Sequence, residues 1–122
     1  MTPSDDIATA AEAMLMVENA ALPLVVVLPD GRVAMANRAL RELLGCASQE
    51  LADRMIWELL ADADSAERWW GEFIVSRATG APARVVHLRG CDGRAVSARS
   101  ATIIVADAAG DPRLVIGSAI PV

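Results

Sequence analysis

Few residues of this 122-residue chain combine the types and spacing that chemistry requires. The two cysteines, Cys46 and Cys91, lie far apart without Cys-x-x-Cys spacing, and with the single histidine, His87, they do not form a zinc-ligand set. The sequence also lacks a Ser-His-Asp arrangement, a nucleophilic Cys-His motif and a glycine-rich phosphate loop. We therefore expect a protein that is not an enzyme and binds no metal, with both cysteines as free thiols in a reducing compartment.

The side chains that could bind a small molecule are apolar, with one arginine among them. Arg84 has the same parity as Val86 and Leu88 in an expected strand, so the two-residue alternation of a strand places all three on one face. An arginine at the mouth of an apolar pocket could hold a carboxylate through two hydrogen bonds. The aromatic residues could equally fill the core, and Arg84 could be an exposed residue at a strand end. The candidate ligand-binding residues are Met35, Trp57, Trp70, Phe73, Arg84, Val86 and Leu88.

A short hairpin is expected to position the first of these residues. Residues 24–28 are all apolar and predict a strand that is covered on both faces. A Pro-Asp-Gly turn follows, in which Asp30 is preceded by a proline that presets φ and Gly31 tolerates a positive φ. Residues 32–36 then predict a second strand that pairs back on the first.

A series of helices should follow the hairpin. The side-chain oxygen of Asn37 can cap a helix over residues 38–44, and Gly45 is a natural stop for it. Two further short helices are predicted over residues 48–51 and 55–60.

A longer helix is predicted next. It begins at Asp64, with Glu67 three residues later in an arrangement similar to a capping box, and the Gly-Ala-Pro of residues 80–82 ends it.

The last third of the chain is predicted to be strands. They cover residues 84–89, 94–106 and 114–120, and the Asp92-Gly93 pair makes the turn between the first two. Strands on both sides of a helical segment indicate an α+β fold, in which one antiparallel sheet carries helices over one face.

A separate amphipathic helix is predicted before the hairpin, over residues 5–19. Its apolar stripe must be covered either by its own domain or by a second copy of the chain. We divide the chain into this N-terminal helix, residues 1–20, and a compact domain, residues 21–122. The candidate dimer contacts are Ile7, Ala11, Met14 and Leu15.

Composition and charge narrow the class of protein further. All eleven basic residues are scattered arginines and the formal net charge is −5, so no basic stripe is present that would neutralise nucleic-acid phosphates. The longest apolar run, residues 20–28, is too short to cross a bilayer as a helix and contains a proline. The N-terminus is acidic where a secretory signal would be basic, so we expect a cytoplasmic protein with no direct nucleic-acid or membrane contact.

Three stretches carry a resemblance to a known family. The first, VVVLPDGRVAMANRALRELLG, combines the hairpin, the asparagine-capped helix and the glycine stop. The second, SQELADRMIWELL, holds short helices, and the third, LRGCDGRAVSARSATIIVADAAGDPRLVIGSAI, holds three strands with Asp-Gly between the first two. In order and spacing these stretches resemble the PAS domain family over about residues 22–120. The resemblance implies a five-stranded antiparallel sheet, helices that close a pocket against one face, and often a dimer through a helix before the first strand.

The resemblance also bears on cofactors. Flavin-binding members with photochemistry carry a cysteine in the short helical region, and residues 53–60 contain none. Haem-binding members generally use a histidine on the long helix, and residues 65–78 contain none. His87 has the opposite strand parity to Val86 and Leu88, which directs it to the outer face. Haem and flavin are therefore not expected, and the identity of any ligand stays open.

The predicted function is that of a PAS-like sensory and dimerisation or interaction module. It would form a homodimer and regulate an attached or partner effector, such as a histidine kinase, a cyclic-nucleotide enzyme or a transcription regulator. In the alternative, a small apolar or acidic ligand enters the pocket between sheet and helices and thereby controls the effector.

Overall fold

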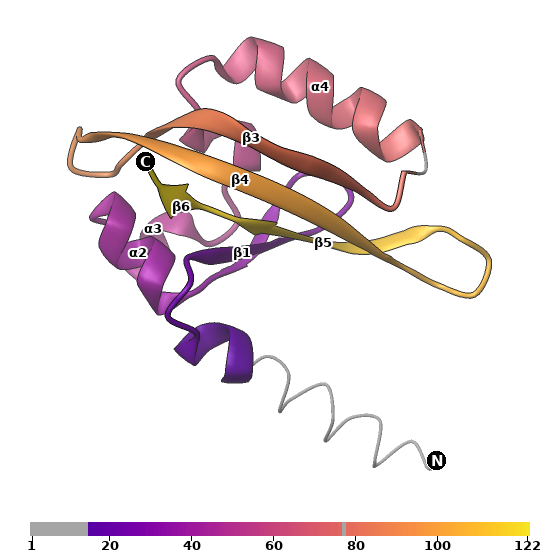
Figure 1. Cartoon of the computed structure of the whole chain (residues 1–122), viewed down its shortest axis with the longest axis horizontal. Helices are drawn as coiled ribbons and strands as arrows, with labels where there is room; N and C mark the ends of the chain where they lie inside the picture. The colour runs from indigo at the N-terminus through magenta and orange to yellow at the C-terminus, as the bar shows by residue number, and fades with distance from the viewer. Residues whose placement is uncertain (1–14, 77) are drawn as a thin grey trace.

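The protein folds as one antiparallel sheet with helices packed over one face (Figure 1). The computed structural model describes residues 15–76 and 78–122. Five strands follow the spatial order β2-β1-β5-β4-β3, and a sixth strand of two residues pairs with β4. The strands are β1 (Leu24–Val27), β2 (Val33–Ala36), β3 (Gly80–Arg89), β4 (Ala95–Ala106), β5 (Pro112–Ser118) and β6 (Ile120–Pro121). The predicted α+β class, with five main strands and helices on one face, is confirmed.

The opening hairpin forms as the sequence predicts. The Oδ1 atom of Asp30 accepts the backbone N–H of Arg32 at 2.9 Å, and the N–H of Gly31 donates to the Leu28 carbonyl at 2.8 Å. Gly31 has a φ of +96°, a region that side chains other than glycine rarely adopt. The ring of Trp57 packs directly on its α-carbon, so the turn is also a packing surface.

The helices begin close to their predicted positions. They are α2 (Arg38–Leu44), α3 (Ser48–Leu51), the 3₁₀ helix η1 (Ile56–Leu59) and α4 (Ala63–Val75). Asn37 caps α2 through its side chain, and Gly45 ends it in the left-handed conformation, as predicted. The prediction that Asp64 caps the long helix is wrong. Asp62 occupies the cap and accepts the backbone N–H of Ser65 at 3.2 Å. Hydrogen bonding by the Ser65 side chain, and then by its backbone, lowers the pKa of Asp62.

The prediction that Gly-Ala-Pro ends the long helix is also wrong. The helix ends at Val75, and residues 80–82 are already part of β3, where Gly80 and Ala81 pair with β4. The register shifts between Ala81 and Arg84, across Pro82. Because proline cannot donate a hydrogen bond to the ladder, an irregularity at an edge strand is where it can be accommodated.

The last strand begins and ends two residues earlier than predicted. Instead of one strand over residues 114–120, β5 ends at Ser118 and the chain bends at the buried Ala119, whose N–H donates to the Pro23 carbonyl at 3.0 Å. The two residues of β6 then pair with β4 at Ala98 and Arg99.

The core lies between the sheet and the helices. One buried cluster joins α2, α3 and η1 to β2 and β4, and its largest members are Leu40, Leu44, Leu51 and Leu59. A second cluster joins Trp70 and Phe73 of α4 to Val27 and Val115. Both clusters pack on the same face of the sheet, so a pocket between sheet and helices would lie on that face.

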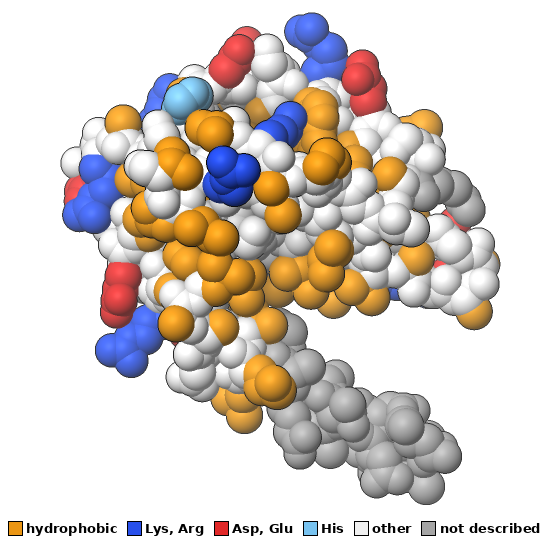
Figure 2. All heavy atoms as spheres, viewed as in Figure 1, with side chains coloured by type: hydrophobic (Ala, Val, Ile, Leu, Met, Phe, Trp, Pro, Cys, Tyr) orange, Lys and Arg blue, Asp and Glu red, His pale blue; other side chains and the backbone are white. Residues whose placement is uncertain are grey.

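Only the end of the predicted N-terminal helix lies within the described residues. Residues 15–19 are helical, as predicted, whereas Ile7, Ala11 and Met14 lie outside the described part. Leu15 and its neighbour Met16 are 63% and 74% exposed. In Figure 2 their helical turn carries hydrophobic side chains at the surface. The division into a helix of residues 1–20 and a domain of residues 21–122 stays a prediction.

Candidate functional site

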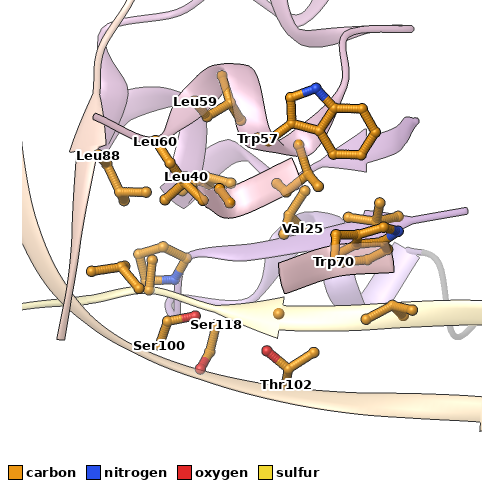
Figure 3. A pocket seen from close by; sticks show the side chains of 18 of the residues that line it. Val25, Leu40, Trp57, Leu59, Leu60, Trp70, Leu88, Ser100, Thr102 and Ser118 are labelled. Carbon is orange, nitrogen blue, oxygen red and sulfur yellow. The ribbon is translucent and has the colours of Figure 1, made fainter. Parts of the chain in front are cut away.

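A cavity of about 100 Å³ lies between the helices and the inner face of the sheet (Figure 3). Its helical side is formed by α2, η1 and α4, and its floor by β1, β3, β4 and β5. The wall is largely apolar, with Val25, Leu40, Leu59, Leu60 and Leu88 among the residues that line it.

The structure brings five of the seven predicted ligand-binding residues to this cavity. Trp57 comes from η1, Trp70 from α4, and Arg84, Val86 and Leu88 from β3. The shared parity of the three β3 residues therefore places them on one side, as the sequence predicts.

Met35 and Phe73 do not line the cavity, which corrects the sequence-based grouping. Met35 is paired with Val26, whereas the neighbouring pair of Val25 and Ala36 faces inward, so the pleat turns Met35 away from the cavity. It borders a separate surface hollow beside Arg41. Phe73 is buried in the core cluster of Trp70, Val27 and Val115 and is not among the residues that line the cavity.

An aromatic stack holds the cavity's arginine. The guanidinium carbon of Arg84 lies 4.1 Å from the centre of the Trp69 ring. Trp69 in turn stacks on Phe73, with 4.8 Å between ring centres and 13° between planes. Within the described part of the chain, Arg84 forms no ion pair, so its hydrogen-bonding fork is available. Trp69 is not among the seven predicted ligand-binding residues, although the i, i+4 spacing of Trp69 and Phe73 signals a contact along a helix.

Three hydroxyl residues lie on the sheet side of the cavity. Ser100, Thr102 and Ser118 all line it, and Figure 3 shows them together below the apolar side chains. Ser100 is paired with Arg84 across the β3–β4 ladder, so the arginine and a hydroxyl group share one end of the cavity. The hydroxyl of Ser118 already contacts the backbone of Ala101, whose N–H donates to it at 3.2 Å. The cavity is thus largely apolar, with three hydroxyl side chains on its sheet side.

A buried polar junction ties the N-terminal helical turn to the sheet. Asn37 is fully buried, and its Nδ2 atom donates to the Val17 carbonyl at 2.8 Å. Beside it, Arg41 forms two hydrogen bonds to the Glu18 carboxylate, at 2.8 and 3.2 Å, and a third to the Ala36 carbonyl at 2.7 Å. The Arg41 hydrogen bond lowers the pKa of Glu18, which keeps the ion pair charged near neutral pH. The helical turn is therefore fixed relative to β2 and α2.

The cysteines are not free thiols, in contrast to the sequence-based interpretation. Cys46 and Cys91 form a disulfide with their Cα atoms 5.1 Å apart. The bond joins the end of α2 to the turn between β3 and β4. The fold brings these two segments together, and the spacing of the cysteines in the sequence gives no sign of it.

The histidine lies where strand parity predicts. His87 is exposed, opposite in parity to the cavity residues, and its Nδ1 atom is 3.0 Å from the Ser97 hydroxyl oxygen. Over residues 15–76 and 78–122, no group of three or more histidine, cysteine or acidic side chains is arranged to hold a metal ion.

Comparison with known proteins identifies the family. A family model described as the PAS fold matches residues 17–122. This chain belongs to the PAS family. As a PAS domain it is a sensory signalling module of a class that is generally not catalytic. No protein in a search of curated proteins matches it.

Solved structures share the PAS fold at low sequence identity. The PAS domain of an HTR-like protein from Haloarcula marismortui is 19% identical, with a TM-score of 0.72 over 98% of this chain and 96% of that one. A PAS domain from a two-component sensor histidine kinase is 13% identical, with a TM-score of 0.77 over 96% and 99%. The Rhodobacter sphaeroides LOV protein is 12% identical, with a TM-score of 0.79 over 95% and 68%. None of the helices within the described residues has the length and apolarity needed to cross a bilayer.

Proposed function

We propose that this PAS domain is the sensory and dimerisation or interaction module of a cytoplasmic signalling or regulatory protein. It forms a homodimer, performs no catalysis itself, and controls an attached or partner effector. A histidine kinase, a cyclic-nucleotide enzyme and a transcription regulator are the candidate effectors. The structural likeness to a PAS domain of a sensor histidine kinase supports this choice of class.

The exposed apolar end of the N-terminal helix is the observation that carries the proposal. Leu15 and Met16 place two large apolar side chains in water, on a helical turn that the Glu18–Arg41 pair and the Asn37–Val17 hydrogen bond hold in place. Burying them against a second copy would remove apolar surface from water without any reordering of that turn. The small cavity agrees with this function, because pockets for drug-sized ligands start at about 300 Å³.

Charging this surface should separate the dimer. We expect the double variant L15E/M16E to be monomeric at a concentration where the wild-type chain is dimeric, because two carboxylates per copy would have to be buried. Native mass spectrometry and sedimentation velocity measure the oligomeric state. Deleting the whole helix is a less precise test, since it also removes Glu18 and the Val17 carbonyl, which contact the folded domain.

The control is V75E at the exposed end of α4, where an 82% exposed valine is replaced by one carboxylate at a site outside the proposed contact. This variant should keep the wild-type oligomeric state. A dimer that survives in L15E/M16E would contradict the proposed contact, and a monomeric wild-type chain would contradict dimerisation through this domain.

A second candidate function is supported by Arg84. Its guanidinium is held over Trp69 at the cavity and has hydroxyl groups nearby, which suits a small ligand with a carboxylate and a short apolar chain. In this function the domain is a receptor that binds such a ligand and passes occupancy to the effector. The volume of about 100 Å³ limits the ligand to a few non-hydrogen atoms.

Short-chain carboxylates test the receptor function directly. Butyrate should shift the NMR resonances of residues that line the cavity, whereas neutral butyramide should bind at least about tenfold more weakly, because one charge-assisted contact is worth roughly that factor. Arg84→Ala should remove the preference for the acid. Arg99→Ala, an exposed arginine of β4 paired with Val85 and of opposite parity to Arg84, should retain it. An equal response of both variants would remove Arg84 from the recognition of the ligand.

A further inference from the structure

We propose that Cys46 and Cys91 form a reversible thiol–disulfide switch that regulates the helical wall of the cavity. The pair joins the end of α2 to the β3–β4 turn, with Cα atoms 5.1 Å apart. This separation lies within the range that a disulfide requires, so the bond can form without a backbone movement. Disulfides of cytosolic proteins are usually transient or redox-sensing, which is the behaviour assigned here.

The junction around the disulfide is held by contacts that do not depend on it. The N–H of Cys91 donates to the Leu44 carbonyl at 3.0 Å, and a guanidinium nitrogen of Arg94 lies 3.3 Å from the Leu43 carbonyl oxygen. Arg94 also pairs with Asp92, and its hydrogen bond lowers the pKa of that carboxylate. The reduced protein therefore keeps both thiols adjacent, which is the condition for a bond that can re-form quickly.

The disulfide closes the segment that forms most of the helical wall of the cavity. The segment between the two cysteines contains α3, η1, α4 and β3, which provide most of the helical wall and Arg84. Leu44, two residues before Cys46, is fully buried and lines the cavity. In the oxidised state both ends of this segment are fixed to each other. Reduction leaves hydrogen bonds and apolar packing between the two segments but no covalent link, so the end of α2 and the turn should open more often.

The exposure of the two cysteines determines which of them a reductant attacks first. Cys46 is 9% exposed, whereas Cys91 is partly exposed in its turn, so an external dithiol attacks Cys91 Sγ. The disulfide breaks, a mixed disulfide forms at Cys91, and Cys46 leaves as a thiolate that takes up a proton. The second thiol of the reductant then displaces Cys91. In total two electrons and two protons pass from the dithiol to the protein, and the dithiol becomes a disulfide.

The switch is tested on the full chain in buffers with graded ratios of reduced to oxidised dithiothreitol. Alkylation followed by intact mass measurement counts the free thiols at each ratio. We expect a single reversible step from two thiols to none in the folded protein, with the near-UV circular dichroism of the tryptophans retained in both states. Hydrogen exchange in residues 43–46 and 90–94 should become at least about tenfold faster on reduction, whereas exchange in β5 should not change.

The double variant C46S/C91S is the control. In every buffer, its hydrogen exchange and near-UV circular dichroism should match those of the reduced wild-type chain. The proposal is overturned if the thiols stay free in the most oxidising buffer, or if the bond opens only after denaturation. It is also overturned if reduction unfolds the domain or leaves exchange at the junction unchanged. The test does not use the oligomeric state, so its failure and a failure of the proposed dimer function are distinguishable.

Discussion

Replacing Asn37 by alanine should lower the free energy of unfolding by about 4 kcal/mol, because one buried side chain satisfies four backbone groups. Its Oδ1 atom accepts the N–H groups of Leu24 and Leu40 at 2.9 and 3.0 Å. Its Nδ2 atom donates to the carbonyls of Val17 and Leu22 at 2.8 and 2.9 Å. Loss of a helix cap alone costs about 1 kcal/mol, and each buried group left without a partner adds about 1 to 3 kcal/mol when no water replaces the side chain.

Urea denaturation followed by circular dichroism measures this change. Asn19→Ala is the matched control, since the Asn19 side chain makes one exposed hydrogen bond to the Leu15 carbonyl. It should change the free energy of unfolding by less than about 0.5 kcal/mol. If the two variants lose similar stability, Asn37 does not act as the central polar link between the N-terminal turn, β1 and α2.

Asn37 also shows how much of the fold the sequence could predict. Its bond to Leu40 spans three residues, so a capping rule finds it from local sequence. Its bond to Val17 spans twenty residues and depends on how the N-terminal turn meets β2, for which no local pattern exists. Because the Asn37 cap and the Gly45 stop are both local signals, α2 was predicted at its observed bounds.

The predicted start and end of the long helix were wrong because the residues there fit more than one local structure. Asp62 and Asp64 are both residues that suit a helix cap, and in the structure Asp62 takes this position. In β3, Pro82 looked like a helix stop because the sequence does not show that an edge strand can accommodate it at a register shift.

Within the candidate site, local sequence could predict the placement of side chains along one element but not the contacts between elements. Parity placed Arg84, Val86 and Leu88 on one face, because the alternation of a strand is a local property. The pairing of Arg84 with Ser100 depends on the register between β3 and β4, and the disulfide depends on the docking of a helix end onto a turn. Both follow from tertiary packing, which no spacing in the chain encodes.

Replacing Gly31 by alanine should lower the free energy of unfolding by about 3 kcal/mol. A side chain at a φ of +96° costs about 1 to 2 kcal/mol of backbone strain. The added methyl group would also overlap the ring of Trp57, and overpacking of this kind typically costs 1 to 3 kcal/mol. Gly71→Ala on α4 is the matched control, since among the described residues nothing beyond its own helix backbone and chain neighbours lies within 4 Å of the position that its added methyl group would take. It should stabilise the helix by about 0.5 to 1 kcal/mol.

A double-mutant cycle separates the two causes. If the ring overlap contributes, Gly31→Ala should cost about 1 to 2 kcal/mol less in a Trp57→Leu background, whereas backbone strain alone should give additive effects. Because Trp57 also lines the cavity, an overlap that moves its ring should shift the NMR resonances of Leu59 and Leu88 in the single variant. A Gly31→Ala protein as stable as Gly71→Ala would show that the hairpin turn neither requires glycine nor supports the cavity wall.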